Sequence, residues 1–273
     1  MPVASPTGSA TTSDLALLLD AGREASALAM RYFAGGAKQW LKENGTPVSE
    51  ADIAVSRLLA DRLRLARPDY GWLCEEDEDD AGRLAASAVF IIDPIDGTRE
   101  FLAGRQEWTI SVAVVRAGRP TAALLAAPAL GETYWAAIGE GTFLDGRRML
   151  ASAAADFGGA RLAGPKRALR EVAARAGVPP GDIRFVGSLA YRLAMVSLDR
   201  AEVAVGASGS REWDLAAADL LLQESGAALT DIAGDPIRYN RPDTIQPPVI
   251  AAAPALATEA RRLVEGALAN ETG

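Results

Sequence analysis

The spacing of apolar residues predicts two long helices near the start of the chain. The first covers residues 14–33, where leucines recur on one side and a Gly-Gly pair follows at residues 35–36. The second covers residues 49–66, where apolar residues occupy the i, i+3, i+4 and i+8 positions. Both segments are therefore interpreted as helices with one apolar side.

Apolar runs of strand length follow in the middle of the chain. Residues 108–115 and 121–126 are joined by a Gly- and Pro-containing link, which is a hairpin signal, and residues 132–137 form another run. A further run, residues 89–92, stops abruptly at the sequence Asp-Pro-Ile-Asp-Gly-Thr. We expect a buried strand here, a sharp turn at Asp-Pro and a helical turn that begins near Gly97. The first half of the chain thus predicts a mostly antiparallel sheet beside the two helices.

After residue 150 the pattern changes to short strands that alternate with helices, which indicates a layered α/β lobe. The expected strands are residues 161–163, 183–186, 202–205 and 228–230, and the expected helices are residues 167–176, 190–198, 214–224 and 254–268. We therefore divide the chain into a flexible tail (residues 1–13), an N-terminal α+β lobe (residues 14–150) and a C-terminal α/β lobe (residues 151–273).

Composition excludes several classes of chemistry. The chain has 273 residues, enough for one large domain or two moderate lobes with a sizeable core. Its net charge of −8 argues against a surface that binds nucleic-acid polymers. The lone Cys74 excludes an internal disulfide and a multi-cysteine zinc site, and the lack of histidine excludes a Ser-His-Asp triad. Catalysis would therefore depend on carboxylates, hydroxyls, amides, basic side chains and an added metal ion.

The N-terminal dozen residues are small and polar, without the basic start and apolar stretch of a signal peptide. No apolar run reaches the length of a membrane span. We therefore expect a cytoplasmic protein.

Acidic side chains gather where the expected strands and helices begin or end. They are Asp52, Glu75 with its neighbour Glu76, Asp93, Asp96 and Asp214. Carboxylate oxygens hold hard cations such as Mg²⁺, and the amides at a helix start suit an anion such as phosphate. The alternative is structural, because Asp-Pro and Asp-Gly form turns and acids stabilise the first turn of a helix. The acidic run at residues 77–80 is expected to be a solvated loop.

Residues 93–98 resemble the signature of the inositol monophosphatase superfamily, which contains metal-dependent, lithium-sensitive phosphatases. Other segments match motifs of this superfamily in the same order, namely residues 48–52, the Glu75-Glu76 pair, residues 139–146 and residues 213–217. The resemblance extends from about residue 14 to residue 268. It implies a layered α-β-α-β-α sandwich of two lobes, with the active site between them.

The same resemblance implies a role for each candidate residue. The carboxylates and one backbone carbonyl would bind two or three Mg²⁺ ions, through Glu75, Asp93, Asp96, Asp214 and the carbonyl of Ile95. Thr98, hydrogen-bonded to Asp52, would orient a water molecule that Glu75 helps to deprotonate. The amides of Gly97 and Thr98 would hold the phosphate. The partner is then a small phosphate ester.

Within the superfamily, residues 99–101 (Arg-Glu-Phe) and the Gly187-Ser188 pair resemble the bacterial 3′(2′),5′-bisphosphate nucleotidase branch. This implies that adenosine 3′,5′-bisphosphate is the substrate and that Ser188 and Asp214 contact it. One departure affects the substrate contacts, because residues 164–168 replace the Ser-Arg-Ser-His that many nucleotidases carry. Lys166 and Arg167 could bind a phosphate there, or could form a solvated helix start.

Two other functions remain open at this point. Inositol-1-monophosphatases, or phosphatases of other small sugar and polyol phosphates, use the same metal site. A non-catalytic sensor of phosphate ligands would also retain the acidic residues. Oligomeric state is open as well, because the superfamily contains monomers and dimers, so a homodimer is one alternative.

Overall fold

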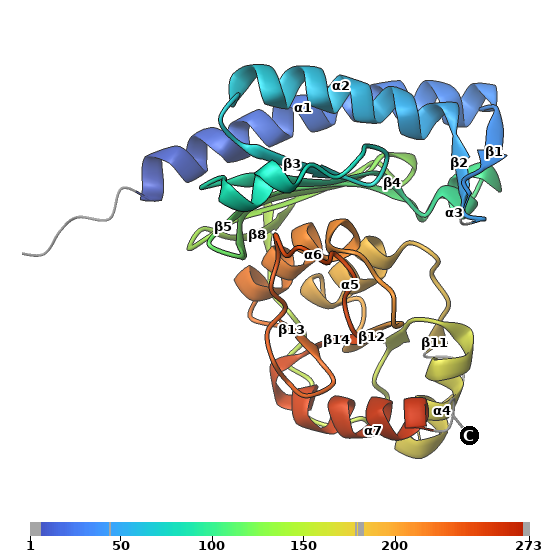
Figure 1. Ribbon diagram of the computed structural model, residues 1–273. Helices are drawn as coiled ribbons and strands as arrows, with labels where there is room; N and C mark the ends of the chain where they lie inside the picture. The colour runs from blue at the N-terminus through green and yellow to red at the C-terminus, as the bar shows by residue number, and fades with distance from the viewer. Residues whose placement is uncertain (1–6, 44, 178, 180–182, 270–273) are drawn as a thin grey trace, which may run out of the picture.

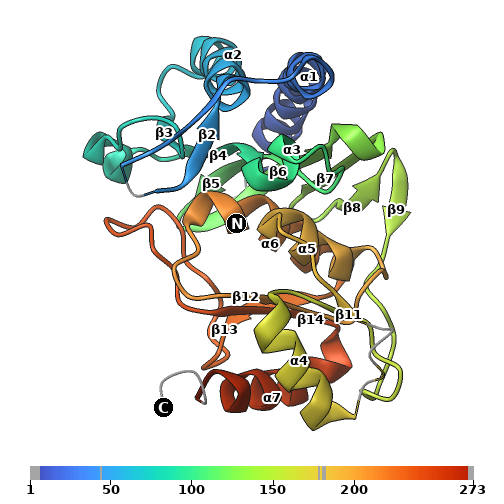
Figure 2. The same cartoon turned by 90° about the vertical axis from the view of Figure 1, so that its right-hand side faces the viewer.

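Helices and sheets alternate in five stacked layers in the computed structural model (Figure 1; Figure 2). The structure describes residues 7–43, 45–177, 179 and 183–269. The outer helices are α1 (Thr7–Gly35) and α2 (Glu50–Ala66) on one side and α4 (Lys166–Ala176) and α7 (Ala257–Ala269) on the other, and the central helices are α5 (Leu189–Ser197) and α6 (Glu212–Ser225). A sheet separates the central helices from each outer pair, which confirms the predicted α-β-α-β-α sandwich.

The two sheets are built from consecutive parts of the chain. The first has the order β3 (Gly71–Cys74), β4 (Val89–Asp96), β5 (Thr109–Arg116), β6 (Arg119–Ala127), β7 (Glu132–Ala137), β8 (Gly141–Leu144) and β9 (Arg147–Met149). Only the β3–β4 pair of this sheet is parallel, so the predicted mostly antiparallel sheet and its β5–β6 hairpin are confirmed.

The second sheet has the order β11 (Ile183–Arg184), β10 (Leu162–Ala163), β12 (Val203–Gly206), β14 (Val249–Ala252) and β13 (Ala228–Asp231). Strands β11, β10 and β12 are parallel, so their carboxyl ends meet at one edge of the sheet. The loops that lead into α4, α5 and α6 therefore start from the same edge. A separate hairpin, β1 (Gln39–Leu41) with β2 (Pro47–Ser49), leads into α2.

Three apolar clusters hold the layers together. One lies between α1, α2 and the first sheet, the second surrounds α5 and α6 between the sheets, and the third lies under α4 and α7. Every residue of α5 is buried, as are ten residues of α6. Because apolar side chains on all sides fix these two helices, their N-terminal ends are fixed as well.

A polar network ties the end of α5 to the first sheet. Arg200 donates to Glu132 at the start of β7, with 2.8 Å between Nη2 and Oε1, and to the Tyr191 hydroxyl at 3.3 Å. Glu132 also accepts a hydrogen bond from the Tyr134 hydroxyl. The network connects residues of both lobes and holds α5 against the first sheet.

Helix α1 begins earlier than the sequence predicts. It starts at Thr7, so the predicted flexible tail is wrong for residues 7–13, whereas residues 1–6 lie outside the described residues. The fully buried Asp14, seven residues after Thr7, pairs its carboxylate with Arg116 and with Arg67, at 3.0 Å from Nε of the latter. These contacts hold the N-terminal half of the helix against the rest of the fold, which local propensity does not reveal.

Several short strands were not predicted. They include β14, which pairs with both β12 and β13, and the edge strands β1 and β9. Each has three or four residues, which is too short for a periodic pattern to be recognised. The other predicted elements are present, with boundaries that differ by three residues or fewer, except that α1 starts earlier and β4 ends four residues later than expected.

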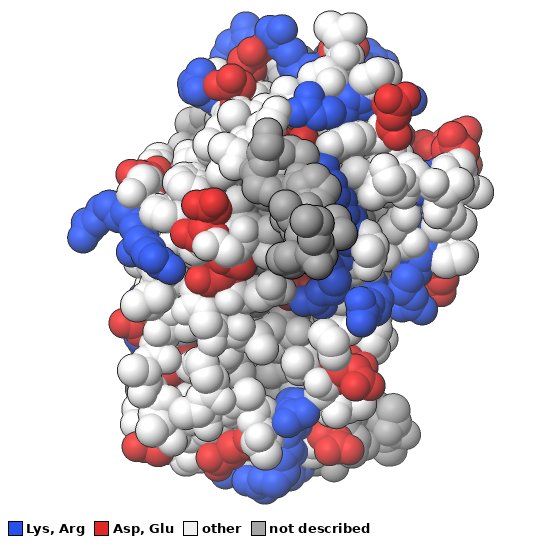
Figure 3. All heavy atoms as spheres, turned by 90° about the vertical axis from the view of Figure 1, so that its left-hand side faces the viewer, with Lys and Arg blue, Asp and Glu red and all other residues white. Residues whose placement is uncertain are grey.

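The surface shows no concentration of a single charge on the face drawn in Figure 3, where basic and acidic side chains are interspersed. The acidic residues 77–80 are exposed, as expected. None of the helices in the described part of the chain combines the length and the apolarity that a membrane span requires.

One buried acid in α6 makes stability depend on pH. Asp219 is 1% exposed, and its one ion pair, to Arg119, has an N–O distance of 3.6 Å. Burial raises the pKa of Asp219 to about 6, so the folded state binds a proton more tightly than the unfolded state between about pH 4 and pH 6. Stability due to this group is therefore fully present at low pH and decreases as pH rises through that range.

We predict that this dependence disappears in Asp219→Asn. Relative to the variant, the wild type should lose up to about 3 kcal/mol of unfolding free energy between about pH 4 and pH 6, measured by urea unfolding. Asp69→Asn, which changes an exposed aspartate, serves as the control and should follow the wild type. Parallel pH profiles for the wild type and Asp219→Asn would contradict the assignment.

Candidate metal centre and active site

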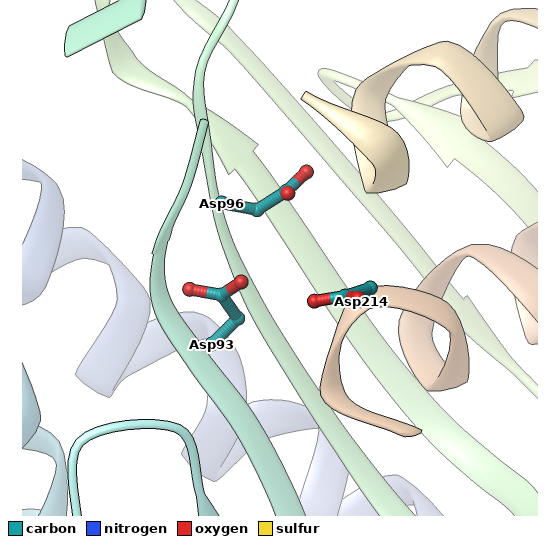
Figure 4. Close-up of side chains that lie close together, drawn as sticks. All are labelled: Asp93, Asp96 and Asp214. Carbon is teal, nitrogen blue, oxygen red and sulfur yellow. The ribbon is translucent and has the colours of Figure 1, made fainter. Parts of the chain in front are cut away.

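Three carboxylates from two layers of the fold converge at one point. Asp93 and Asp96 come from β4, and Asp214 comes from the first turn of α6. Each offers an oxygen atom, and these three atoms lie within 4.8 Å of one another. Figure 4 shows the three side chains directed toward a common space. The sequence motifs that contain them are 118 residues apart, so only folding brings them together.

A β-bulge brings Asp93 and Asp96 to the same side of the first sheet. Asp93 pairs with Ser111 and Asp96 with Thr109, so β4 has one more residue than β5 over this segment. Side chains three residues apart on a regular strand point to opposite faces of the sheet. The extra residue of the bulge shifts this alternation by one, so Asp93 and Asp96 point to the same face. The predicted sharp turn at Asp93-Pro94 is therefore wrong, because β4 continues to Asp96.

The N-terminus of α5 holds Asp96 in place. The Ser188 hydroxyl donates to Asp96, as do the N–H groups of Leu189 at 3.2 Å and Ala190 at 2.7 Å. Amides at a helix start carry partial positive charge, so this contact stabilises a carboxylate at the junction of the lobes. Ser188 itself is fully buried beneath Asp96.

Asp52 and Asp214 occupy equivalent positions in α2 and α6. Asp214 accepts the N–H of Arg211 at 2.7 Å, and Asp52 accepts both the N–H of Ser49 at 2.8 Å and its hydroxyl at 2.6 Å. These capping contacts fix the orientation of each carboxyl group. The second oxygen of Asp52 accepts a hydrogen bond from the Thr98 hydroxyl at 3.0 Å, which is the contact that the sequence predicted. Both acids therefore stabilise the first turn of a helix, as the structural alternative predicted. The same contacts leave them able to act in the site.

The cluster carries more negative charge than the protein stabilises. Burial, together with the charges of Glu75 and Asp96, raises the pKa of Asp93 well above its usual value. Burial also raises the pKa of Asp214 well above the usual value and that of Asp96 to about 6. Buried like charges avoid ionisation unless a cation compensates them. Oxygen donors at this spacing fit a hard divalent cation such as Mg²⁺.

The acidic cluster lies in a cavity of about 390 Å³ with the expected phosphate-binding segment. Gly97 has a φ of 92°, and a Cβ atom there would approach the Cβ of Ser188 to 3.1 Å, so the position requires glycine. Thr98 begins the short helix α3 (Thr98–Leu102). The Ile95 carbonyl, also in the wall, lies 3.1 Å from the Thr98 hydroxyl oxygen and is a second acceptor, beside Asp52, for its single hydrogen.

Other predicted residues lie outside the tight cluster. Glu75 lines the same cavity, but its carboxylate binds Lys42 at 3.0 Å, and Lys42 also binds Glu76 at 2.7 Å. Lys166 and Arg167 are exposed at the start of α4 and do not belong to the described residues that line this cavity.

Two basic residues near the site were missed. Lys42 lies in β1–β2, where the sequence offers no motif. Arg192 is buried in α5, its Nε atom has no hydrogen-bond partner in the described structure, and the charges of Asp96, Asp214 and Glu100 act on it. Arg192 follows Ser188 by four residues, so on a helix the two side chains lie on the same face. This spacing is the signal in the sequence that could have identified Arg192.

Comparison with known proteins gives consistent results. The model of the "Inositol monophosphatase family" matches residues 12–269. The chain is 30% identical over 216 residues to a 3′(2′),5′-bisphosphate nucleotidase from Haemophilus influenzae, covering 75% of this chain and 79% of the relative. It is 36% identical over 213 residues to an inositol-1-monophosphatase from Rhizobium meliloti, covering 71% and 75%. A solved Thermotoga maritima IMPase superimposes with a TM-score of 0.85 at 26% identity, covering 96% of this chain and 100% of that one.

We predict that Asp93→Asn changes stability in two opposite ways. Without divalent cations it should raise the melting temperature, because one of three repelling charges is removed. With Mg²⁺ at about 100 times its dissociation constant, the wild type should gain about 2.7 kcal/mol, and the variant should gain far less. Thermal unfolding with EDTA and with Mg²⁺ measures both effects.

The control Asp69→Asn also removes one carboxylate, but from the exposed surface. It should retain the full Mg²⁺-induced shift. An equal shift in Asp93→Asn and the wild type would show that the cation does not bind at this cluster.

Proposed function

Because the chain belongs to the inositol monophosphatase family, we propose that it is a Mg²⁺-dependent phosphomonoesterase that hydrolyses the 3′-phosphate of adenosine 3′,5′-bisphosphate. Family membership makes the chain a phosphatase, and the substrate and metal requirement are the proposal. The observation that carries the proposal is the cluster of Asp93, Asp96 and Asp214, the first two buried and the third half-buried, in a cavity that Gly97 and Thr98 also line.

The residues that would hold two or three Mg²⁺ ions are Asp93, Asp96, Asp214, Glu75 and the carbonyl of Ile95. When bound, Mg²⁺ polarises the phosphoryl group and lowers the pKa of water. Glu75, whose carboxylate accepts a hydrogen bond from Lys42, would join this set by exchanging that contact for one with the cation. A lysine already paired with two glutamates can keep Glu76 as its partner.

The Thr98 hydroxyl and Asp52 orient the attacking water. The Thr98 hydroxyl donates a hydrogen bond to Asp52, so the lone pairs of its oxygen can accept a hydrogen bond from water. Burial raises the pKa of Asp52, which makes the ionised carboxylate a stronger base than an exposed aspartate. A proton from water can therefore move through Thr98 toward Asp52.

The segment that follows β4 holds the phosphate. Gly97 allows the backbone to approach the substrate closely, and the amides of Gly97 and Thr98 are the proposed donors to the phosphate oxygens. The oxygen of water forms a bond to phosphorus while the bond to the 3′-oxygen of the substrate breaks. The departing oxygen takes a proton and leaves as an alcohol.

Two observations support a nucleotide substrate. Arg99 and Glu100 line the cavity beside Gly97, and one similar relative is named a bisphosphate nucleotidase. A Cβ atom added to Gly187 would lie 2.0 Å from the Oε1 atom of Glu100. The Glu100 side chain therefore fits against this segment only because residue 187 is glycine. Inositol 1-phosphate is the second candidate, since a relative of higher identity is named an inositol-1-monophosphatase.

We predict that phosphate release is faster from adenosine 3′,5′-bisphosphate than from inositol 1-phosphate, at equal concentrations of enzyme and Mg²⁺. The comparison uses one purified protein and one detection method, so only the leaving group differs. A higher kcat/KM for inositol 1-phosphate would favour the second candidate. Saturable binding of both compounds without turnover would instead favour the sensor.

We also predict that Thr98→Val lowers kcat by roughly 10²- to 10⁴-fold, with a much smaller change in KM. Valine has nearly the shape of threonine but cannot pass a proton to Asp52. The Mg²⁺-induced rise in melting temperature should persist, because no proposed metal-binding oxygen side chain is removed. Thr258→Val, an exposed change in α7, controls for loss of a hydroxyl elsewhere. Near-normal kcat in Thr98→Val would contradict the proton path.

A further inference from the structure

A second cavity, of about 630 Å³, adjoins the metal centre on the side of α6. It shares Thr46, Glu75 and Asp214 with the cavity of about 390 Å³ described above. A phosphate bound beside Gly97 would therefore leave room for the rest of its ester to extend past Asp214. A volume of this size is within the range that accommodates small-molecule ligands.

Three charged residues in the wall of this second cavity, Lys42, Glu75 and Asp79, form ion pairs within the protein, and the other acids of the wall accept hydrogen bonds from neutral N–H groups. Asp79 accepts two hydrogen bonds from Arg83, at 2.6 and 2.8 Å. Asp77 accepts the indole N–H of Trp72 at 2.6 Å. Lys42, one of the two cations in the wall, is paired with two glutamates. Its charge is thus compensated before any ligand binds.

Arg211 differs from Lys42 in this respect. Its guanidinium donates to the neutral hydroxyl of Thr244 at 3.0 Å, and it forms no ion pair within 4.0 Å among the residues that the structure describes. The Arg211 Cζ atom lies 5.8 Å from the centroid of the Trp213 ring, which also lines the cavity. The ring and the hydroxyl hold the guanidinium in place while leaving several of its N–H donors for a ligand.

We propose that Arg211 binds a second phosphate, carried by the leaving group of the substrate. The inference rests on the proposed function, which puts the scissile phosphate at the metal cluster. A planar guanidinium can donate two parallel hydrogen bonds to a phosphate, and half-burial in the cavity strengthens that contact. Arg211 thus selects bisphosphorylated substrates, and Trp213 positions it.

The location of Arg211 fits this role better than that of the other candidate cations. Lys166 and Arg167 lie outside the described lining of both cavities, and Arg192 is buried in α5 away from the lining of the second cavity. Arg211 lies three residues before Asp214, whose carboxylate its backbone N–H binds. The second phosphate would therefore bind next to the metal centre and on the far side of Asp214 from Gly97.

The test compares two substrates with the same nucleoside, adenosine 3′,5′-bisphosphate and adenosine 3′-monophosphate. In Arg211→Gln, the ratio of kcat/KM for the bisphosphate to that for the monophosphate should fall by about 10- to 100-fold, as expected for loss of a hydrogen bond to a charged group. The change should appear mainly in KM for the bisphosphate. Arg211→Lys, which keeps the charge but not the planar donors, should lose part of this selectivity.

Arg238→Gln provides the matched control, because Arg238 is exposed and does not line the described part of either cavity. It should keep the wild-type ratio. Calorimetric binding of adenosine 5′-monophosphate, which carries only the phosphate assigned to Arg211, gives a readout without turnover. Its affinity should fall by about 10- to 100-fold in Arg211→Gln.

The outcomes separate this inference from the proposed function. An unchanged substrate ratio in Arg211→Gln, in an enzyme that does hydrolyse the bisphosphate, overturns the inference alone. A wild-type enzyme that hydrolyses inositol 1-phosphate but not the bisphosphate overturns the proposed substrate. In that case, binding of adenosine 5′-monophosphate that depends on Arg211 still supports an anion subsite, and binding that does not depend on it refutes the subsite.

Discussion

Mutual repulsion among three carboxylates, two of them buried and one half-buried, is the constraint on which the arrangement of this protein depends. Asp93, Asp96 and Asp214 are close enough to share one cation, and burial raises the pKa of each. Without compensation such a cluster opposes folding, so the surrounding structure must hold it by other means. The large apolar clusters on both sides of the first sheet provide that support. The site is therefore an electrostatically unfavourable point in a well-packed fold, and a divalent cation bound there would compensate the repulsion.

Helix N-termini are the recurring device that holds the acids. Asp52 and Asp214 each cap the first turn of their own helix, and Asp96 caps the start of α5 from another layer. Each contact uses backbone N–H groups that would otherwise lack partners, so orienting the carboxylates also stabilises the helices. The parallel strands of the second sheet direct two of these helices toward the same edge. The same contacts therefore stabilise the helix starts and orient the carboxylates of the site.

Reaction and selectivity depend on different parts of the site. The acids, Gly97 and Thr98 form a centre that would act on any phosphate monoester that reaches it. The walls differ in charge and shape, with Glu100 and Gly187 on one side and Arg211 with Trp213 on the other. A phosphatase of this architecture can change its substrate through the walls without altering the cluster.

The sequence by itself determined the elements whose pattern is local. These include the apolar stripe of α2, the β5–β6 hairpin, and the acids at element ends, three of which proved to lie near one another. Tertiary structure alone decided features that depend on distant partners. The bulge that turns Asp93 and Asp96 to one side follows from pairing with β5, and the attachment of α1 to the rest of the fold follows from the pairing of Asp14 with Arg67 and Arg116. The same holds for the pairing of Lys42 with Glu75 and for the free donors of Arg211, because charge compensation depends on which side chains folding brings within reach.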